Sequence, residues 1–398
     1  MNMFPNITRE AIVRSRLAKT RGFTLMELMI SMALGLLILG SALLMYKQAV
    51  NGEFVTSEKS EMQQDFRAAA NLMQRDISMA GSGSLGQAGL AANSIGLPTG
   101  TGSTVPVYPC SATACTYVNG TSVAYPTVSG APYLYSIMPG YDLGITVNAA
   151  TGASDIITVA YADANLMLNC YVYTVTSATT VTFQLPTTLP ATCILPPYPS
   201  TVTAPPVLND PVVGLQPGDY IVFGQAAAGV VTNITVASPA SGYSAAYTVT
   251  FNSGDPGHID QPTITNGTLK SLVSGSASTL SAVRMLIITY YLDISPIDGV
   301  TPRLMRIQNG KTPVPVAENV TNLKFSYDVD NGGVVTANLP SLTAGITPNM
   351  ITKVNILHMT IRSQLHGASG YQGLDLQTSI CARNLTMGQE YQITGSSY

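Results

Sequence analysis

The segment 328–333, with the sequence DVDNGG, is the part of this chain whose side chains could most readily hold a metal ion. Calcium takes about six to eight oxygen ligands, and carboxylates and an amide beside a glycine turn supply such oxygens. Asp328, Asp330 and Asn331 are therefore candidate calcium ligands. The pattern lacks an acidic residue at the distal position that completes a calcium-binding loop, so a plain hairpin turn at Asn331-Gly332 is the alternative.

Residue types that carry out acid–base or nucleophilic catalysis are sparse. The chain has 398 residues, three His and 10% charged side chains. His258, His358 and His366 have no carboxylate or cysteine at metal-ligand spacing, and no Ser/His/Asp or paired-carboxylate arrangement is recognisable. A formal charge of −3 excludes a broad nucleic-acid-binding surface, which needs a basic excess to neutralise phosphates. We expect a non-catalytic protein without a nucleic-acid partner and, apart from the candidate calcium, without a cofactor.

The five cysteines suit an oxidising compartment. Cys110 and Cys115 would close a small loop, and Cys170 and Cys193 flank a predicted hairpin whose ends come together. Disulfides at these two places would each contribute about 2–4 kcal/mol. Cys381 is left over and is expected to be buried as a small hydrophobic residue, although its pairing with one of the other four stays open.

A basic segment and a long apolar run open the chain. Residues 1–22 carry five Lys or Arg and one acidic residue, and residues 28–46 are uncharged. A helix over that run would be about 28 Å long, close to the ~30 Å hydrocarbon core of a bilayer. The preceding positive charges keep the N-terminal end in the cytoplasm, so the body would lie on the other side. No small-residue cleavage site follows the run, unlike in an ordinary secretory signal.

The junction 21–28, RGFTLMEL, closely resembles the type IV prepilin signal of bacterial pilins and pseudopilins. The resemblance implies that a membrane-bound prepilin peptidase cuts between Gly22 and Phe23 and that Phe23 becomes the N-methylated first residue. Loss of residues 1–22 would change the formal charge from −3 to −7. It also implies an inner-membrane, single-pass precursor with a periplasmic body, which moves to the cell-surface pilus on assembly.

Glu27 is an acidic residue at the start of the apolar helix, where a charge costs several kcal/mol unless it is paired. In the prepilin family the matching glutamate is thought to meet the free N-terminal amine of a neighbouring subunit. The resemblance therefore implies an assembly role for Glu27. The alternative is a carboxylate that sits at the headgroup boundary.

The helix is expected to continue beyond the membrane, over residues 23–80. No Pro interrupts this range, and Gly81 follows it. Apolar residues recur at spacings of three and four along the second half and predict a face that packs on the body: Met62, Phe66, Ala69, Met73 and Ile77. The charged residues around this stripe, Asp76 included, are expected on the polar surface.

Residues 81–398 should form a β-rich body. No Lys or Arg occurs from Ile77 to Leu269, and the segment is rich in Thr, Ser, Val, Tyr, Gly and Pro, which favours short strands joined by turns. Residues 82–153 show few long apolar runs. Strands are predicted at 155–162, 171–176, 180–185, 219–223, 282–294, 303–307, 323–329, 350–362 and 374–384, with a hairpin in 230–251. The fold class is α+β, a pilin-like lollipop with a long N-terminal helix packed on a largely antiparallel body.

Four segments resemble the PilW-type minor pilins: 154–163, 217–225, the run 289–332, and the pair 354–363 and 376–384. Residues around 85–150 and 229–280 do not match and are interpreted as insertions. The resemblance implies a minor pilin that joins other minor pilins and the major pilin to prime a type IV pilus, which supports adhesion or twitching motility. A minor pseudopilin of type II secretion is the alternative, whereas an anchored hydrolase lacks a recognisable site.

Overall fold

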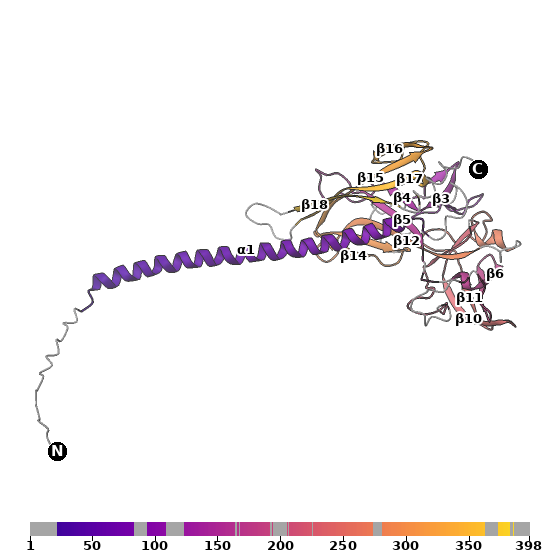
Figure 1. Cartoon of the computed structure of the whole chain (residues 1–398), viewed down its shortest axis with the longest axis horizontal. Coiled ribbons are helices and arrows are strands. Elements are labelled where there is room, and N and C mark those ends of the chain that lie inside the picture. Colours follow the sequence, from indigo (N-terminus) through magenta and orange to yellow (C-terminus); the bar gives the residue numbers. More distant parts are fainter. Residues whose placement is uncertain are drawn as a thin grey trace, which may run out of the picture. The chain divides into compact units, whose positions relative to one another are not determined.

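The computed structural model describes residues 22–82, 94–108, 123–163, 165–166, 168–191, 193, 205, 207–224, 226–273, 281–362, 373–382 and 385. The chain divides into two compact units, Met1–Ser57 and Glu58–Tyr398. Helix α1 (Leu25–Met79) begins in the first unit and ends in the second (Figure 1). Each unit is described by itself below.

Helix α1 ends in a backbone conformation that requires glycine. Gly81 has φ +74, and a Cβ there would lie 3.1 Å from side-chain atoms of both Leu385 and Ser136. Both the left-handed conformation and this close approach disfavour any larger residue. In the second unit, the predicted apolar stripe of α1 is buried, which confirms that part of the prediction: Met62, Phe66, Ala69, Met73 and Ile77.

A seven-stranded antiparallel sheet forms the centre of the second unit. Its main path runs β14-β13-β12-β5-β4, and β8 and β9 extend it through β12. The bounds are β4 (Ile137–Gly140), β5 (Ile156–Ala162), β8 (Tyr220–Phe223), β9 (Ala227–Val230), β12 (Ala282–Ile294), β13 (Pro302–Gln308) and β14 (Val314–Glu318). Strand β5 lies between two neighbours and is buried at every position. This explains its continuous apolar sequence, since neither face meets water.

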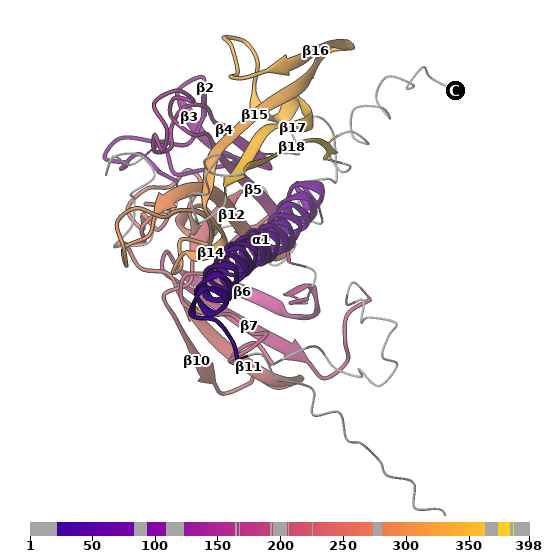
Figure 2. The ribbon, with the colours of Figure 1, turned by 90° about the vertical axis from the view of Figure 1, so that its left-hand side faces the viewer.

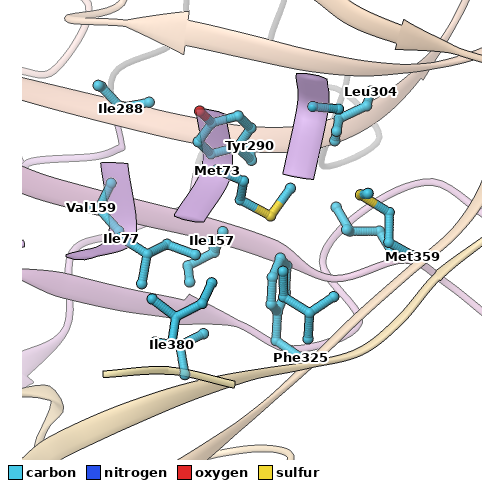
Figure 3. Packing of buried hydrophobic residues seen from close by; sticks show 14 of the residues in the cluster. Met73, Ile77, Ile157, Val159, Ile288, Tyr290, Leu304, Phe325, Met359 and Ile380 are labelled. Atoms are coloured by element: carbon cyan, nitrogen blue, oxygen red, sulfur yellow. The ribbon is translucent and has the colours of Figure 1, made fainter. Parts of the chain in front are cut away.

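A four-stranded sheet of order β16-β15-β17-β18 packs with the central sheet around α1. Its strands are β15 (Val320–Asn331), β16 (Val334–Leu339), β17 (Ile351–Arg362) and β18 (Gly373–Cys381). Figure 3 shows Met73 and Ile77 of α1 among residues of both sheets, with Tyr290 and Ile157 from the central sheet and Phe325 from β15. The largest hydrophobic core is therefore built around the second half of α1.

Two smaller sheets complete the second unit. One has the order β10-β11-β7-β6 and its own core, and the other has the order β1-β3-β2. Their bounds are β1 (Ser94–Gly96), β2 (Thr127–Val128), β3 (Ala131–Tyr135), β6 (Val172–Ser177), β7 (Thr180–Pro186), β10 (Asn233–Ala237) and β11 (Tyr243–Thr250). Short 3-10 helices lie at η3 (Leu168–Cys170), η4 (Leu269–Leu272) and η6 (Pro348–Met350). In Figure 2 the β10-β11-β7-β6 sheet and the β15–β18 sheet lie at opposite ends of the second unit.

The predicted strands are present, and every strand pair among the described residues is antiparallel. The α+β class is therefore confirmed at that level. The strands that the sequence did not indicate are short ones: β1 to β4 within 82–153, and also β9, β14 and β16. Strand β4 contains Pro139 and Gly140, which interrupt any alternation of apolar residues, yet it pairs with β5 in the central sheet.

Candidate functional site

The predicted cleavage junction lies immediately before α1. Gly22 and Phe23 are both exposed, and the Phe23 side chain retains 76% of its accessible surface. A Cβ added at Gly22 would have no atom within 4 Å. The bond between these two residues is therefore accessible in this structure, and an alanine at position 22 would not disturb the chain's own packing.

Thr24 and Glu27 form a capping box at the start of α1. The Thr24 N–H donates to Glu27 Oε2 at 3.1 Å, and the Thr24 hydroxyl donates to the same oxygen at 3.2 Å. In return, the Glu27 N–H donates to Thr24 Oγ1 at 3.3 Å. This reciprocal pair satisfies backbone donors that a helix start otherwise leaves without partners.

The capping box gives Glu27 a role within its own subunit that the sequence interpretation did not include. The Thr-x-x-Glu spacing at 24–27 is the signal that could have revealed it. The carboxylate is held at the positive end of the helix, where the backbone dipole favours a negative charge. Glu27 is also four residues from Phe23 in the sequence and is exposed at the start of the helix.

The first half of α1 has the character of a membrane anchor. It contains an 18-residue window that is long and apolar enough to cross a membrane, and none of that window is buried. Large apolar side chains such as Leu36, Leu37 and Ile38 are mostly exposed to solvent. Exposure of so many aliphatic groups is unfavourable in water, so this segment requires a bilayer or other helices around it.

Asp76 connects the second half of α1 to the central sheet, contrary to the expectation that it lies on the polar surface. It retains 2% of its accessible surface. Tyr161 on β5 and Tyr290 on β12 donate their hydroxyls to Asp76 at 2.9 and 2.6 Å, and Arg306 Nε on β13 donates at 2.9 Å. The expectation was wrong because Asp76 directly precedes Ile77 and lies at the margin of the buried stripe, where a neighbouring sheet can cover it.

The electrostatic surroundings of this cluster keep its donors protonated. Burial raises the pKa of both Tyr161 and Tyr290, and the negative charge of Asp76 raises it further. Burial acts to lower the pKa of Arg306, but the hydrogen bond and charge of Asp76 outweigh this effect and raise it. Two phenols and one guanidinium on three adjacent strands therefore all donate to one carboxylate of the helix.

The acidic turn folds as a hairpin between β15 and β16. Gly332 and Gly333 form the two-residue loop with φ +66 and +92, so the turn is Gly-Gly and not Asn331-Gly332. Asp330 Oδ1 accepts the Gly333 N–H at 2.7 Å. Both residues of the loop need positive φ, which glycine adopts without strain.

The Asp328 carboxylate contacts donors on the two neighbouring strands of its sheet. Its Oδ1 accepts the Asn338 N–H and the Asn355 amide, each at 2.9 Å, and Lys353 lies 3.3 Å from its Oδ2. Burial acts to raise the pKa of Asp328, but these donors outweigh it and hold the pKa below its usual value. No group of three His, Cys, Asp or Glu positioned for a metal occurs within the described part of the chain. Calcium binding by Asp328, Asp330 and Asn331 stays a prediction.

Cys170 and Cys193 are joined by a disulfide, with their Cα atoms 4.3 Å apart. They flank the β6–β7 hairpin, which belongs to the β10-β11-β7-β6 sheet. Cys110 and Cys115 lie outside the described residues. Cys381 is free and exposed, so the expectation that it is buried was wrong. Side chains alternate along a strand, and on β18 the neighbouring Ile380 takes the inward position.

The histidines occupy surface positions where the structure describes them. His258 is exposed in a loop at φ +53, and His366 lies outside the described residues. His358 Nδ1 lies 2.8 Å from Asp375 Oδ2 on the neighbouring strand. The sequence spacing of 17 residues did not indicate this pair, because it depends on the β17–β18 register.

Comparison with family models gives a match at the N-terminus. The family model described as "Prokaryotic N-terminal methylation motif" matches residues 17–43, which include the predicted cleavage junction and the start of α1. This prepilin-type signal supports a type IV pilin- or pseudopilin-like protein and implies processing by a prepilin peptidase. The apolar helix near the N-terminus indicates membrane anchoring of the kind that pilin export uses. No curated protein and no solved structure matches the chain.

Proposed function

We propose that this chain is a minor pilin of the PilW type, a non-catalytic subunit that takes part in priming a type IV pilus and in its tip complex. The observation that carries the proposal is the coincidence of the methylation motif at 17–43 with α1, whose first half is apolar and exposed. Its partners would be other minor pilins, the major pilin, the prepilin peptidase and the inner membrane. The assembled pilus would then support adhesion or twitching motility.

The position of the PilW-like segments supports the pilus interpretation. Segment 154–163 contains β5, the run 289–332 contains β13 and β15, and the final pair contains most of β17 and β18. These strands belong to the two sheets that pack around α1. The unmatched range 229–280 instead contains β10 and β11, which lie in the sheet with a separate core. Segment 217–225 contains β8, whose buried residues lie in the other cores, so three of the four resembling segments coincide with the helix-binding core of the body.

The proposed mechanism begins with cleavage after Gly22, which leaves the amine of Phe23 at the head of an apolar helix. An amine in that setting is costly without a counter-charge. Glu27 supplies a carboxylate whose position Thr24 fixes. During assembly this carboxylate would pair with the methylated amine of a neighbouring subunit, while α1 passes from the bilayer into the helical core of the fibre.

Mass spectrometry of the N-terminal peptide tests the processing step. The mature chain should begin at N-methyl-Phe23 in wild-type cells, and Gly22→Ala should impair cleavage. Gly35→Ala is the matched control, because both glycines have open space around an added Cβ and only Gly22 borders the cut. A wild-type chain that retains Met1, or that begins at an unmethylated residue, would refute the prepilin interpretation.

Three variants separate the charge of Glu27 from its capping role. Glu27→Gln removes the charge and keeps a side-chain acceptor for the Thr24 N–H, whereas Thr24→Val removes the reciprocal bond and keeps the charge. If pairing with an amine drives assembly, Glu27→Gln and Glu27→Ala should both reduce incorporation by about a hundredfold or more, because a buried amine loses its counter-charge. Thr24→Val should then have a small effect. Normal pilus number and normal recovery with partner pilins in Glu27→Gln cells would contradict the pairing.

A minor pseudopilin of a type II secretion system is the second candidate, because the methylation motif is common to both groups. Immunogold labelling of sheared surface pili distinguishes the two. Labelled pili, together with a loss of pili on deletion of the gene, are expected for the minor pilin. Normal piliation with a defect in protein secretion would instead assign the chain to the secretion pseudopilus.

A further inference from the structure

Two buried carboxylates lie in the loop between β11 and η4. Asp255 and Asp260 each retain 6% of their accessible surface. The loop contacts three parts of the second unit through backbone hydrogen bonds: Val107 N–H donates to Gly257, Thr99 N–H to Asn266, and Ala228 N–H to Gly267. It therefore joins the segments beside the β1-β3-β2 sheet to strand β9.

The two carboxylates differ in how their oxygens are satisfied. Asp255 uses both, since Oδ2 accepts the Ile259 N–H at 2.9 Å and Oδ1 accepts the Asp260 N–H at 2.8 Å. Asp260 Oδ1 accepts the Val230 N–H of β9 at 2.9 Å. Asp260 Oδ2 is buried and has no hydrogen-bond partner among the residues that the structure describes. A buried carboxylate oxygen without a donor is strongly destabilising if it carries a charge.

The cavity beside Asp260 offers little to a metal ion. Its volume is about 10 Å³, enough for a single water. Its lining is mainly apolar and includes Ala228, Phe251, Ile259 and Leu269, with Thr268 among the few polar residues. Thr268 donates its hydroxyl to the Ile264 carbonyl. Calcium needs about six oxygens or more, which this lining does not provide.

Within the described part of the chain, no cation faces Asp260 from the elements packed around it. Neither Asp255 nor Asp260 takes part in an ion pair within the described residues. On η4, Lys270 is exposed and donates to the Thr263 carbonyl at 2.7 Å. His258 of the loop is exposed, β9 carries no titratable side chain, and β8 contributes the phenol of Tyr220 near Gly257.

Burial and, to a lesser extent, the neighbouring charge of Asp255 raise the pKa of Asp260 to about 9, against the opposing effect of the Val230 N–H. Ionising both of two adjacent carboxylates in apolar surroundings has a large free-energy cost. Asp255 has two N–H donors and Asp260 has one, so the proton belongs on Asp260.

We propose that Asp260 binds a proton in the folded protein and that this proton holds the loop 251–268 on strand β9 as a latch that alkaline conditions loosen. The direction of the pH effect follows from the difference in proton binding between the closed and the opened loop. An opened loop exposes Asp260 and returns it to the ordinary carboxyl pKa, so opening releases a proton. The latch is fully stable below about pH 4 and loses stability steadily as the pH rises towards about 9.

Hydrogen exchange on the full chain in detergent tests this latch. The Val230 amide should lose protection by about tenfold per pH unit between pH 5 and pH 8, after correction for the rise in intrinsic exchange. Asp260→Asn imitates the protonated side chain, so the slope at Val230 should vanish and protection at pH 8 should exceed that of the wild type. Asp210→Asn, at a half-buried residue elsewhere in the unit whose carboxylate accepts the Val212 and Val213 N–H groups, should leave the wild-type slope unchanged.

Two results would overturn the proposal. One is wild-type protection at Val230 that does not change with pH after the correction, and this measurement needs no variant to fold. The other is protection at pH 8 that millimolar calcium chloride restores and EDTA removes, because a metal ion would then neutralise Asp260 in place of the proton. Equal protection with calcium and with EDTA supports the proton.

Discussion

Asp76 and Asp260 are almost equally inaccessible to water but have opposite electrostatic surroundings. Asp76 receives two phenol hydroxyls and the Arg306 guanidinium from three adjacent strands of the central sheet. Asp260 receives one backbone N–H and lies beside a second carboxylate. Burial alone therefore does not determine whether a carboxylate stabilises its surroundings. The charge and number of the donors around it decide the outcome.

The difference has a functional meaning under the proposed role. The Asp76 cluster connects α1 to the sheets that form the largest core. An anchor helix that is pulled from a membrane into a fibre needs such a connection to carry the body with it. The Asp260 loop instead contacts strand β9 and the segments beside the β1-β3-β2 sheet, where a weaker, pH-dependent contact is tolerated.

The largest predicted effect follows from removing the charge of Asp76. Asp76→Asn should destabilise the second unit by about 3–5 kcal/mol near neutral pH, because Arg306 is left partly buried without its counter-charge. Chemical denaturation of the full chain in detergent measures this effect. Asp65→Asn, at an exposed position on the same helix, is the control and should change stability by less than about 0.5 kcal/mol. If Asp76→Asn is as stable as the wild type, the ion pair of Asp76 does not stabilise the second unit, and the contrast drawn with Asp260 is wrong.

Removing the cation should make Asp76 behave like Asp260. Arg306→Gln leaves the carboxylate with two phenols and no counter-charge, so we expect a loss of about 2–3 kcal/mol at pH 8 and a smaller loss at pH 5. The loss of stability is larger at pH 8 because a buried carboxylate without a cation is stable only when it is protonated. As the pH rises, keeping that proton becomes less favourable. Melting temperatures at both pH values measure the change. An equal loss at both would show that Arg306 contributes packing only.

The phenols of the Asp76 cluster should contribute less than the cation. Tyr290→Phe removes one hydrogen bond to a charged group and should cost about 1–2 kcal/mol. Tyr161→Phe should cost a similar amount, and a double-mutant cycle of each with Asp76→Asn isolates the pairwise energies. If Tyr290→Phe is as stable as the wild type, the 2.6 Å contact does not contribute to the anchor.

An exposed carboxylate gives the smallest effect and the opposite pH dependence. Hydrogen bonds from the Thr301 hydroxyl and the N–H groups of Val300 and Thr301 lower the pKa of Asp298 to about 2. The stability that these bonds give the β12–β13 loop is present above the ordinary carboxyl pKa and is lost as the pH falls towards 2. Asp298→Asn should therefore reduce amide protection at Thr301 slightly at pH 6 and not at pH 2. A greater loss of amide protection at pH 2 than at pH 6 would contradict this pH dependence.

Local sequence patterns predicted the elements and the processing signal. The prepilin junction, the span of α1 and its apolar stripe depend on residues within a few turns of one another, and the longer strands depend on unbroken apolar runs. The capping box could have been predicted as well, since Thr24 and Glu27 are three residues apart. Short strands such as β4 were missed, because a Pro and a Gly leave no period to detect.

Only the tertiary structure decided which donors surround the buried carboxylates. The partners of Asp76 are 85, 214 and 230 residues away in sequence, and the β5, β12 and β13 registers bring them together. In the sequence Asp76 and Asp260 are ordinary acidic residues, one beside a helix stripe and one in a Gly/Pro-rich loop. Which of them meets a cation depends on strand pairing over long separations, and the energy of a buried charge is set by those few distant donors.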